Sequence, residues 1–147
     1  MDRRYVETSS LTFVVDTNVL VYSLLRTDPF SEEARKFLER GDELAAPDVW
    51  RPEFINALWV CGRTGRVTTD QVYRFLPLAE NIVSQTIQSH NLWADAFHLA
   101  FEVNHPPYDT LFVALARRYD THLVTYDRRL LELFPTVAKK PSELVTE

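Results

Sequence analysis

The chain has 147 residues, of which 46% are hydrophobic and 12% aromatic, and its formal net charge at pH 7 is −5. This size and hydrophobic content favour one compact domain with its own core. No apolar run approaches the length of a membrane-spanning helix, the N-terminus lacks a signal-peptide pattern, and the single cysteine, Cys61, excludes an internal disulfide. We therefore expect a cytoplasmic protein without a membrane partner, in which Cys61 is an inert, half-buried thiol.

The spacing of apolar residues alternates along the chain between short strand-like runs and helical periodicity. In chain order it predicts a strand at 12–15, helices at 19–26 and 31–40, a strand at 44–46, a helix that ends at Gly65, a helix at 69–82, a strand at 84–89, helices at 92–103 and 109–119, a strand at 122–125 and a last strand near Val137. Strands separated by helices indicate βαβ units, so the fold class is α/β with a largely parallel sheet. Residues 1–11 are expected to form an N-terminal tail and residues 12–147 a single domain.

Individual residues mark where the helices begin and end. Ser31 is the expected N-cap of its helix, and Gly41 is placed to stop that helix. Asp48 is the expected cap of the helix that ends at Gly65, and Pro77 should end or kink the helix at 69–82. The helix at 92–103 carries apolar residues at helical spacing, namely Trp93, Phe97, Ala100 and Phe101.

Four acidic residues stand where a buried element ends or begins. Asp16 follows the apolar run at 12–15, Asp127 follows the strand at 122–125, Asp109 opens a helix, and Glu53 lies early in its helix. Each except Asp16 has an ordinary structural explanation, since Asp109 could be an N-cap, Asp127 a turn residue and Glu53 a solvated side chain. Asp16 needs partners, because an acid after Phe-Val-Val lies near the centre of the sheet.

Together, the four acids predict a metal site. The carboxyl edge of an open α/β sheet is where ligands bind, so these carboxylates are expected to converge there. Without a lysine nearby they would repel one another strongly, and a hard divalent cation bound through oxygen is the usual remedy. The four histidines show no zinc-like spacing with each other or with Cys61, and we expect them to be structural or on the surface.

The negative charge weakens a nucleic-acid partner without excluding it. Most cations are arginines, which bind phosphate through a planar fork, and several are grouped: Arg63 with Arg66, Arg117 with Arg118, and Arg128 with Arg129. If four carboxylates serve a metal, the rest of the surface is nearly balanced in charge.

The ordered motifs resemble those of the PIN-domain ribonucleases, and within them the small toxins called VapC. The resemblance covers about residues 12–141, and the segments that carry it are Val15-Asp16-Thr17-Asn18-Val19-Leu20, Pro47-Asp48, Glu53-Phe54-Ile55-Asn56-Ala57-Leu58, Tyr108-Asp109-Thr110-Leu111-Phe112 and Leu123-Val124-Thr125-Tyr126-Asp127. The departures from the family pattern are Pro52 beside Glu53 and the pair Pro106-Pro107, which put the local loop shape in doubt.

The resemblance implies a three-layer α/β/α sandwich that cleaves RNA internally. It implies Asp16 and Asp109 as the most direct ligands of Mg²⁺, with Mn²⁺ as a substitute, and Glu53 and Asp127 as the remaining acids of the catalytic and metal site. Thr17, Asn18 and Thr125 would orient a carboxylate, a water molecule or the scissile phosphate.

The resemblance also implies a small antitoxin partner and a homodimer. Candidate apolar residues for a dimer interface are Phe30, Trp59, Phe75 and Leu76, which could equally belong to the core.

Three rival classes of function stay open on the sequence. A phosphoacceptor or haloacid-dehalogenase-like domain also has an aspartate after its first strand, but it needs a lysine late in the chain, and Lys139 and Lys140 follow no convincing strand. The second class is a PIN-like binding module without activity. The third is a PIN nuclease of RNA processing that is no toxin.

Overall fold

The computed structural model describes residues 11–25 and 29–144, so the predicted tail at 1–11 lies almost wholly outside the described residues. Five strands within these ranges form one sheet in the order β3-β2-β1-β4-β5, with every neighbouring pair parallel. The strands are β1 Phe13–Val15, β2 Leu44–Pro47, β3 Gln85–Ile87, β4 His122–Val124 and β5 Ala138–Lys139. Each coincides with a predicted strand or lies beside one, β5 beginning one residue after Val137.

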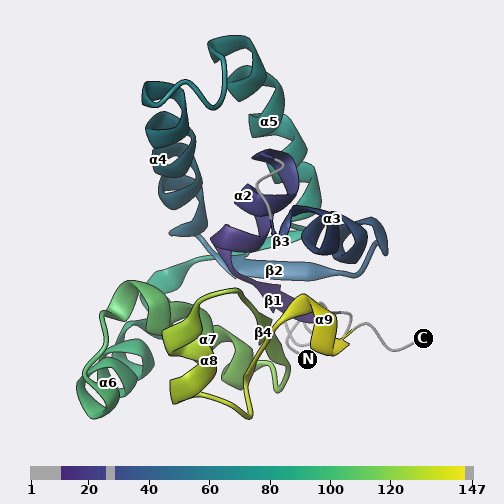
Figure 1. Ribbon diagram of the computed structural model, residues 1–147. Helices are drawn as coiled ribbons and strands as arrows, with labels where there is room; N and C mark the ends of the chain where they lie inside the picture. Colours follow the sequence, from purple (N-terminus) through teal and green to yellow (C-terminus); the bar gives the residue numbers. More distant parts are fainter. Residues whose placement is uncertain (1–10, 26–28, 145–147) are drawn as a thin grey trace, which may run out of the picture.

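Helices lie on both sides of this sheet (Figure 1). They are α2 Thr17–Leu25, α3 Ser31–Glu39, α4 Trp50–Arg63, α5 Thr69–Ile82, the 3₁₀ turn Ser89–Leu92, α6 Trp93–Val103, α7 Pro107–Arg118, α8 Arg128–Leu133 and α9 Pro141–Leu144. In the view of Figure 1, α2 to α5 lie above the sheet and α6 to α8 below it. The α/β/α sandwich with a parallel sheet is therefore confirmed, and no helix of the described part of the chain is long and apolar enough to cross a bilayer.

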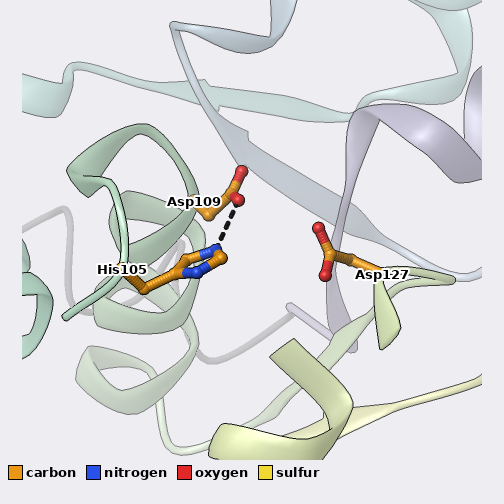
Figure 2. A group of neighbouring side chains, drawn as sticks. All are labelled: His105, Asp109 and Asp127. Atoms are coloured by element: carbon orange, nitrogen blue, oxygen red, sulfur yellow. Dashed lines mark hydrogen bonds and ion pairs between the residues drawn. The ribbon is translucent and has the colours of Figure 1, made fainter. Parts of the chain in front are cut away.

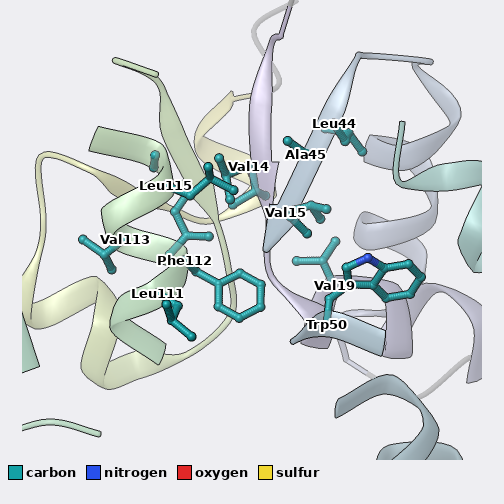
Figure 3. Close-up of a cluster of buried hydrophobic side chains, with 14 of the residues drawn as sticks. Val14, Val15, Val19, Leu44, Ala45, Trp50, Leu111, Phe112, Val113 and Leu115 are labelled. Carbon is teal, nitrogen blue, oxygen red and sulfur yellow. The ribbon is translucent and has the colours of Figure 1, made fainter. Parts of the chain in front are cut away.

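The core is built around the central strand and α7. Val14 and Val15 of β1 are fully buried and point to opposite faces of the sheet, as successive strand residues do. Figure 3 shows Phe112 of α7 and Val14 on one side and Val19 and Trp50 on the other. Every residue of α7 from Thr110 to Ala116 is buried. A helix buried all round is held rigidly, which fixes the residues at its N-terminus.

Two predicted helix caps are wrong. Ser31 is the first residue of α3 and not its cap, and the cap position, Phe30, makes no side-chain hydrogen bond. The helix α4 begins at Trp50 after a Val49 cap, so Asp48 lies one residue too early to cap it. Gly41 does adopt a left-handed backbone (φ 78°) just after α3, where a glycine ends a helix most easily.

Two prolines, Pro52 and Pro77, lie within helices without interrupting them. Pro52 lies in the first turn of α4, where its missing N–H has no intrahelical partner to lose. Pro77 lies inside α5, which continues to Ile82 as the predicted range 69–82 requires, so of the predicted end or kink at Pro77 the end does not occur. Its missing hydrogen bond falls on the carbonyl of Tyr73, a residue that is 68% exposed and accessible to water.

The large aromatic residues of α6 do not lie on the face of the helix that is buried. Ala96, Leu99 and Ala100 are buried. Trp93, Phe97 and Phe101, four residues apart, are 64%, 65% and 80% exposed. A stripe of aromatic side chains therefore lies on the surface.

Candidate active site

Asp16 and Thr125 stand side by side at the carboxyl edge of the sheet. β1 and β4 are paired neighbours, and the N–H of Asp16 continues their ladder by donating to the carbonyl of Val124 at 2.9 Å. Both side chains are buried, Asp16 at 6% exposure and Thr125 at 0%. The sequence pattern of an acid after a buried strand therefore placed Asp16 correctly at this edge.

The carboxylate of Asp16 is buried but well bonded. The Thr125 hydroxyl donates to its Oδ2 at 2.7 Å, and the backbone N–H of Thr17 donates to its Oδ1 at 2.7 Å. Burial nevertheless raises the pKa of Asp16 to about 7, and the nearby charges of Asp109 and Glu53 add to that rise. The two hydrogen bonds act in the opposite direction without cancelling it.

Glu53 comes to the same site from α4. The hydroxyl of Thr17 donates to its Oε1 at 2.7 Å, which ties the start of α2 to α4. Burial raises the pKa of Glu53, and the charge of Asp109 raises it further against the effect of that hydrogen bond. Glu53 is therefore a second carboxyl group that holds its proton more tightly than in water.

Asp109 enters from the first turn of α7, two residues after the Pro107 that opens the helix. Its Oδ2 lies 2.7 Å from Nε2 of His105. Burial is the main cause that raises the pKa of Asp109, the charge of Asp127 contributes, and the bond to His105 lowers it. Burial is the main cause of the raised pKa at all three acids, Asp16, Glu53 and Asp109.

Asp127 is the N-cap of α8 and accepts a hydrogen bond at Oδ1 from the N–H of Leu130 at 3.1 Å. Its own N–H donates to the hydroxyl of Thr125 at 2.9 Å. Asn18 completes the frame, because its Oδ1 accepts from the N–H of Tyr126 at 3.2 Å and its Nδ2 approaches Thr125 Oγ1 at 3.4 Å. The three predicted positioning residues, Thr17, Asn18 and Thr125, thus contact the acids or the loop that carries Asp127.

All four acids line one open cleft of about 400 Å³. The cleft is also lined by a group of largely apolar residues, Val21, Tyr22, Leu25, Ala57 and Cys61, and by Arg66. Cys61 is more deeply buried than predicted, at 8% exposure. The four predicted acids therefore do meet, and the structure adds apolar lining residues to them.

His105 is the site residue that the sequence patterns did not reveal. One donor atom from each of His105, Asp109 and Asp127 lies within 4.8 Å of the other two (Figure 2). The spacing of His105 to the other histidines and to Cys61 carries no metal signal. The contact joins His105 to Asp109, four residues later in the sequence. Pro106 and Pro107 lie between them and interrupt the helical pattern, so this spacing did not indicate a contact.

The residues present fit a divalent cation. Carboxylate oxygens and an imidazole nitrogen are common metal donors. The pKa values of three of the acids are raised, so a positive charge that enters the site would stabilise their charged forms. The contact of 2.7 Å between Asp109 Oδ2 and His105 Nε2 is an ion pair only when the imidazole is protonated. A divalent cation at the site would supply the positive charge that the three acids with raised pKa values favour.

Replacing Thr125 by valine is expected to lower the free energy of unfolding by about 1–3 kcal/mol at pH 8. The change leaves the Asp16 carboxylate and the Asp127 N–H without the hydroxyl that bonds both. Urea denaturation measures it, with Thr125→Ser, which keeps the hydroxyl, as the matched control. Equal stability of the two variants would mean that the hydroxyl does not hold the site together.

Comparisons with known proteins identify the family of this chain. Residues 13–135 match the family model of the PIN domain. Ribonuclease VapC3 of Pyrobaculum aerophilum is 31% identical over 129 residues, which are 86% of this chain and 98% of that protein. The chain therefore belongs to the PIN-domain family, as its motifs indicated.

Two solved structures share the fold. A crystal structure of PAE2754 from Pyrobaculum aerophilum superposes with a TM-score of 0.73 at 23% identity, over 92% of this chain and 87% of that one. A toxin–antitoxin complex from Klebsiella pneumoniae gives a TM-score of 0.62 at 18% identity, over 88% of this chain and 98% of the matched chain. At these identities, the two likenesses show the shared fold and establish no activity or partner for this chain.

Proposed function

We propose that this chain is a metal-dependent endoribonuclease that hydrolyses RNA phosphodiester bonds, and that it is the toxin of a type II toxin–antitoxin pair in the cytoplasm. The observation that carries the proposal is the meeting of Asp16, Glu53, Asp109 and Asp127 in one cleft of a PIN domain. The likeness to a VapC ribonuclease over nearly the whole of that relative supports the substrate class.

The cofactor we propose is Mg²⁺, with Mn²⁺ as a substitute. When bound, such an ion would neutralise the scissile phosphate and lower the pKa of a water molecule. Asp16 and Asp109 are proposed as its most direct ligands, with Glu53 and Asp127 completing the acidic site. Burial raises the pKa of Asp16, Glu53 and Asp109, so a bound cation would favour their charged forms, and without a cation the charged acids would repel an RNA phosphate.

The surrounding residues hold these groups in place. Thr125 orients Asp16 and the backbone before Asp127, and Thr17 orients both Asp16 and Glu53. The apolar lining residues Tyr22, Leu25 and Ala57 offer a surface for a base or sugar of an unpaired nucleotide beside the acids. In this proposal the acids hold the metal, and the apolar lining residues contact the nucleotide.

The experiment that tests this function is cleavage of single-stranded RNA by the purified chain. Cleavage is expected with Mg²⁺ or Mn²⁺ and is expected to stop when a chelator is added and to return when the metal is restored. Cleavage that persists in excess chelator would contradict a metal-dependent mechanism, and binding of RNA without cleavage would favour an inactive PIN-like module.

The partners proposed are RNA, a small antitoxin and a second copy of the chain. The Klebsiella pneumoniae structure with the same fold is a toxin–antitoxin complex, which supports the antitoxin. Of the predicted interface residues, Trp59 is 58% exposed. Phe75 and Leu76 pack against the core, and Phe30 stacks on Tyr126 with ring centroids 4.4 Å apart.

A second candidate surface for the proposed homodimer lies on α6. Trp93, Phe97 and Tyr108 border a cavity of about 280 Å³ that Ala96, Pro107 and Leu111 complete. Phe101 stacks beside Phe97, with centroids 6.1 Å apart, and extends this surface. None of these side chains is charged, so the surface offers no counter-charge to a phosphate, and we propose that it packs against the same surface of a second copy.

Replacing Phe97 by glutamate is expected to convert the dimer to a monomer, because a charge would be buried at its centre. Light scattering across a concentration series measures the change. Tyr73→Glu, which changes an aromatic residue of similar exposure (68%) on α5, is the matched control. A monomeric wild-type protein, or a Phe97→Glu dimer as tight as the wild type, would contradict this interface.

A further inference from the structure

His105 is held rigidly between α6 and α7. The helix α6 ends at Asn104 in a left-handed conformation (φ 57°), and the N–H of His105 returns to the carbonyl of Ala100 at 3.0 Å. The two prolines that follow fix their own φ angles and restrict the residue before them to an extended backbone. The side chain of His105 is only 13% exposed. The loop that departs from the family pattern therefore aims one imidazole at a fixed point.

That point is the acidic cluster. Figure 2 shows the imidazole next to the carboxylate of Asp109, with the carboxylate of Asp127 across the gap from both. His105 Nε2 and Asp109 Oδ2 are 2.7 Å apart, and a donor atom of Asp127 lies within 4.8 Å of each. Metal bonds of about 2.1 Å at right angles place adjacent ligands about 3.0 Å apart, and opposite ligands about 4.2 Å. One ion could therefore contact all three side chains after small adjustments, with the imidazole proton on Nδ1, so that Nε2 binds the ion instead of donating to Asp109.

A nitrogen donor changes which ion is preferred. Mg²⁺ is a hard ion that takes oxygen ligands and keeps several water molecules, so an imidazole adds little to its binding. Mn²⁺ and later transition metals accept imidazole nitrogen as well as carboxylate oxygen. A site of four carboxylates alone would discriminate weakly between Mg²⁺ and Mn²⁺, whereas a site with His105 as ligand favours Mn²⁺.

We propose that His105 is an additional, direct nitrogen ligand of the metal site, beside Asp109 and Asp127, and that it raises the affinity of this site for Mn²⁺ relative to Mg²⁺. The inference rests on the proposed function, because it assigns the ligands and preference of the same metal site. It gives the Asn104–Pro107 loop a role that the four acids alone do not require.

The test measures metal binding without RNA. Electron paramagnetic resonance of the Mn²⁺-loaded protein, with electron spin-echo modulation, detects ¹⁴N of a directly bound imidazole. The wild type is expected to show this coupling and His105→Gln to lack it. Titration is expected to show Mn²⁺ affinity falling about tenfold or more in His105→Gln, with a much smaller change for Mg²⁺. Glutamine can still donate a hydrogen bond to Asp109, so a role limited to positioning that carboxylate would be rescued by this variant.

His98→Gln, which changes an exposed histidine outside the cleft, is the matched control and is expected to behave as wild type. A wild-type protein that binds Mn²⁺ without ¹⁴N coupling, or a coupling that survives in His105→Gln, would overturn the proposal and leave the metal-dependent nuclease intact. Failure of the wild type to bind either Mn²⁺ or Mg²⁺ would overturn both together. Asp109→Asn should lower the affinity for both Mn²⁺ and Mg²⁺. It therefore separates the loss of the metal site as a whole from the loss of the nitrogen ligand alone.

Discussion

Asp16→Asn is expected to abolish RNA cleavage and, at the same time, to stabilise the metal-free protein. The loss of activity follows from removing a carboxylate at the centre of the proposed metal site. Losing several kcal/mol of charge stabilisation is expected to lower the rate of cleavage about a thousandfold or more. Asp109→Asn is expected to have the same effect on cleavage. Full activity of either variant would contradict its assignment as a ligand.

The gain in stability follows from the pKa of Asp16, which burial raises from 3.8 to about 7. Between these two values the folded protein binds more protons than the unfolded chain, so the free energy of unfolding falls as the pH rises through this window. Above pH 7 the charged form costs roughly 4 kcal/mol. Asparagine removes the charge but keeps only one accepting oxygen, so a net gain of about 2 kcal/mol is expected at pH 8.

Thermal unfolding from pH 4 to pH 8 in a chelating buffer measures this effect. The wild type is expected to lose stability across that range, and Asp16→Asn to lose less. Asp70→Asn, at an exposed position in the first turn of α5, removes a charge elsewhere and should retain the wild-type slope. Saturating metal should reverse the order, because only the wild type gains from binding it. A wild-type slope that survives in Asp16→Asn would mean that other groups cause it.

The positions of the acids were predictable because strand ends are easy to recognise. The apolar strand β1 before Asp16, and the buried pair Leu123 and Val124 before Thr125, mark the carboxyl edge of a parallel sheet, and that edge brings distant residues together. Glu53 and Asp109 come from helices. Their sequence surroundings indicated their element but not their direction, which depends on how α4 and α7 pack.

His105 could not be recognised in the same way. Its importance depends on a loop conformation, with Asn104 at positive φ and two prolines after it, which folds the chain back so that residues 105 and 109 face each other. Helical periodicity does not apply across such a break. A histidine beside Pro-Pro carries no local signal of metal binding, so only the three-dimensional contact with Asp109 identifies it.

The surface of α6 shows a second limit of hydrophobic periodicity. The spacing of Trp93, Phe97 and Phe101 correctly predicts a helix, but the protein buries the neighbouring face, which carries Ala96, Leu99 and Ala100. Alanines allow α6 to approach α7 closely, and the aromatic rings would not fit there. Side-chain volume therefore decides which face turns inward, and hydrophobicity alone points the wrong way.

Binding of the antitoxin partner is expected to weaken when the metal site is filled. A guanidinium from the partner can form paired hydrogen bonds with carboxylates and supply the positive charge that Asp16, Glu53 and Asp109 favour. It would occupy the place of the metal ion and block the phosphate, while an amphipathic segment of the partner covers apolar surface beside the helices. If the arginine and the ion compete for one place, metal at a hundred times its dissociation constant should weaken the partner about a hundredfold.

The partner to use is the small protein encoded by the adjacent open reading frame, if that frame carries a DNA-binding sequence. Its affinity is measured by calorimetry with and without Mn²⁺ or Mg²⁺, at matched ionic strength, because salt alone screens charged contacts. In Asp109→Asn the ion should bind poorly, so added metal should no longer weaken the partner. An affinity that does not change with metal in the wild type would mean that the partner inhibits from another surface. The cleft would then stay open to metal in the complex, and inhibition would have to act on access of RNA alone.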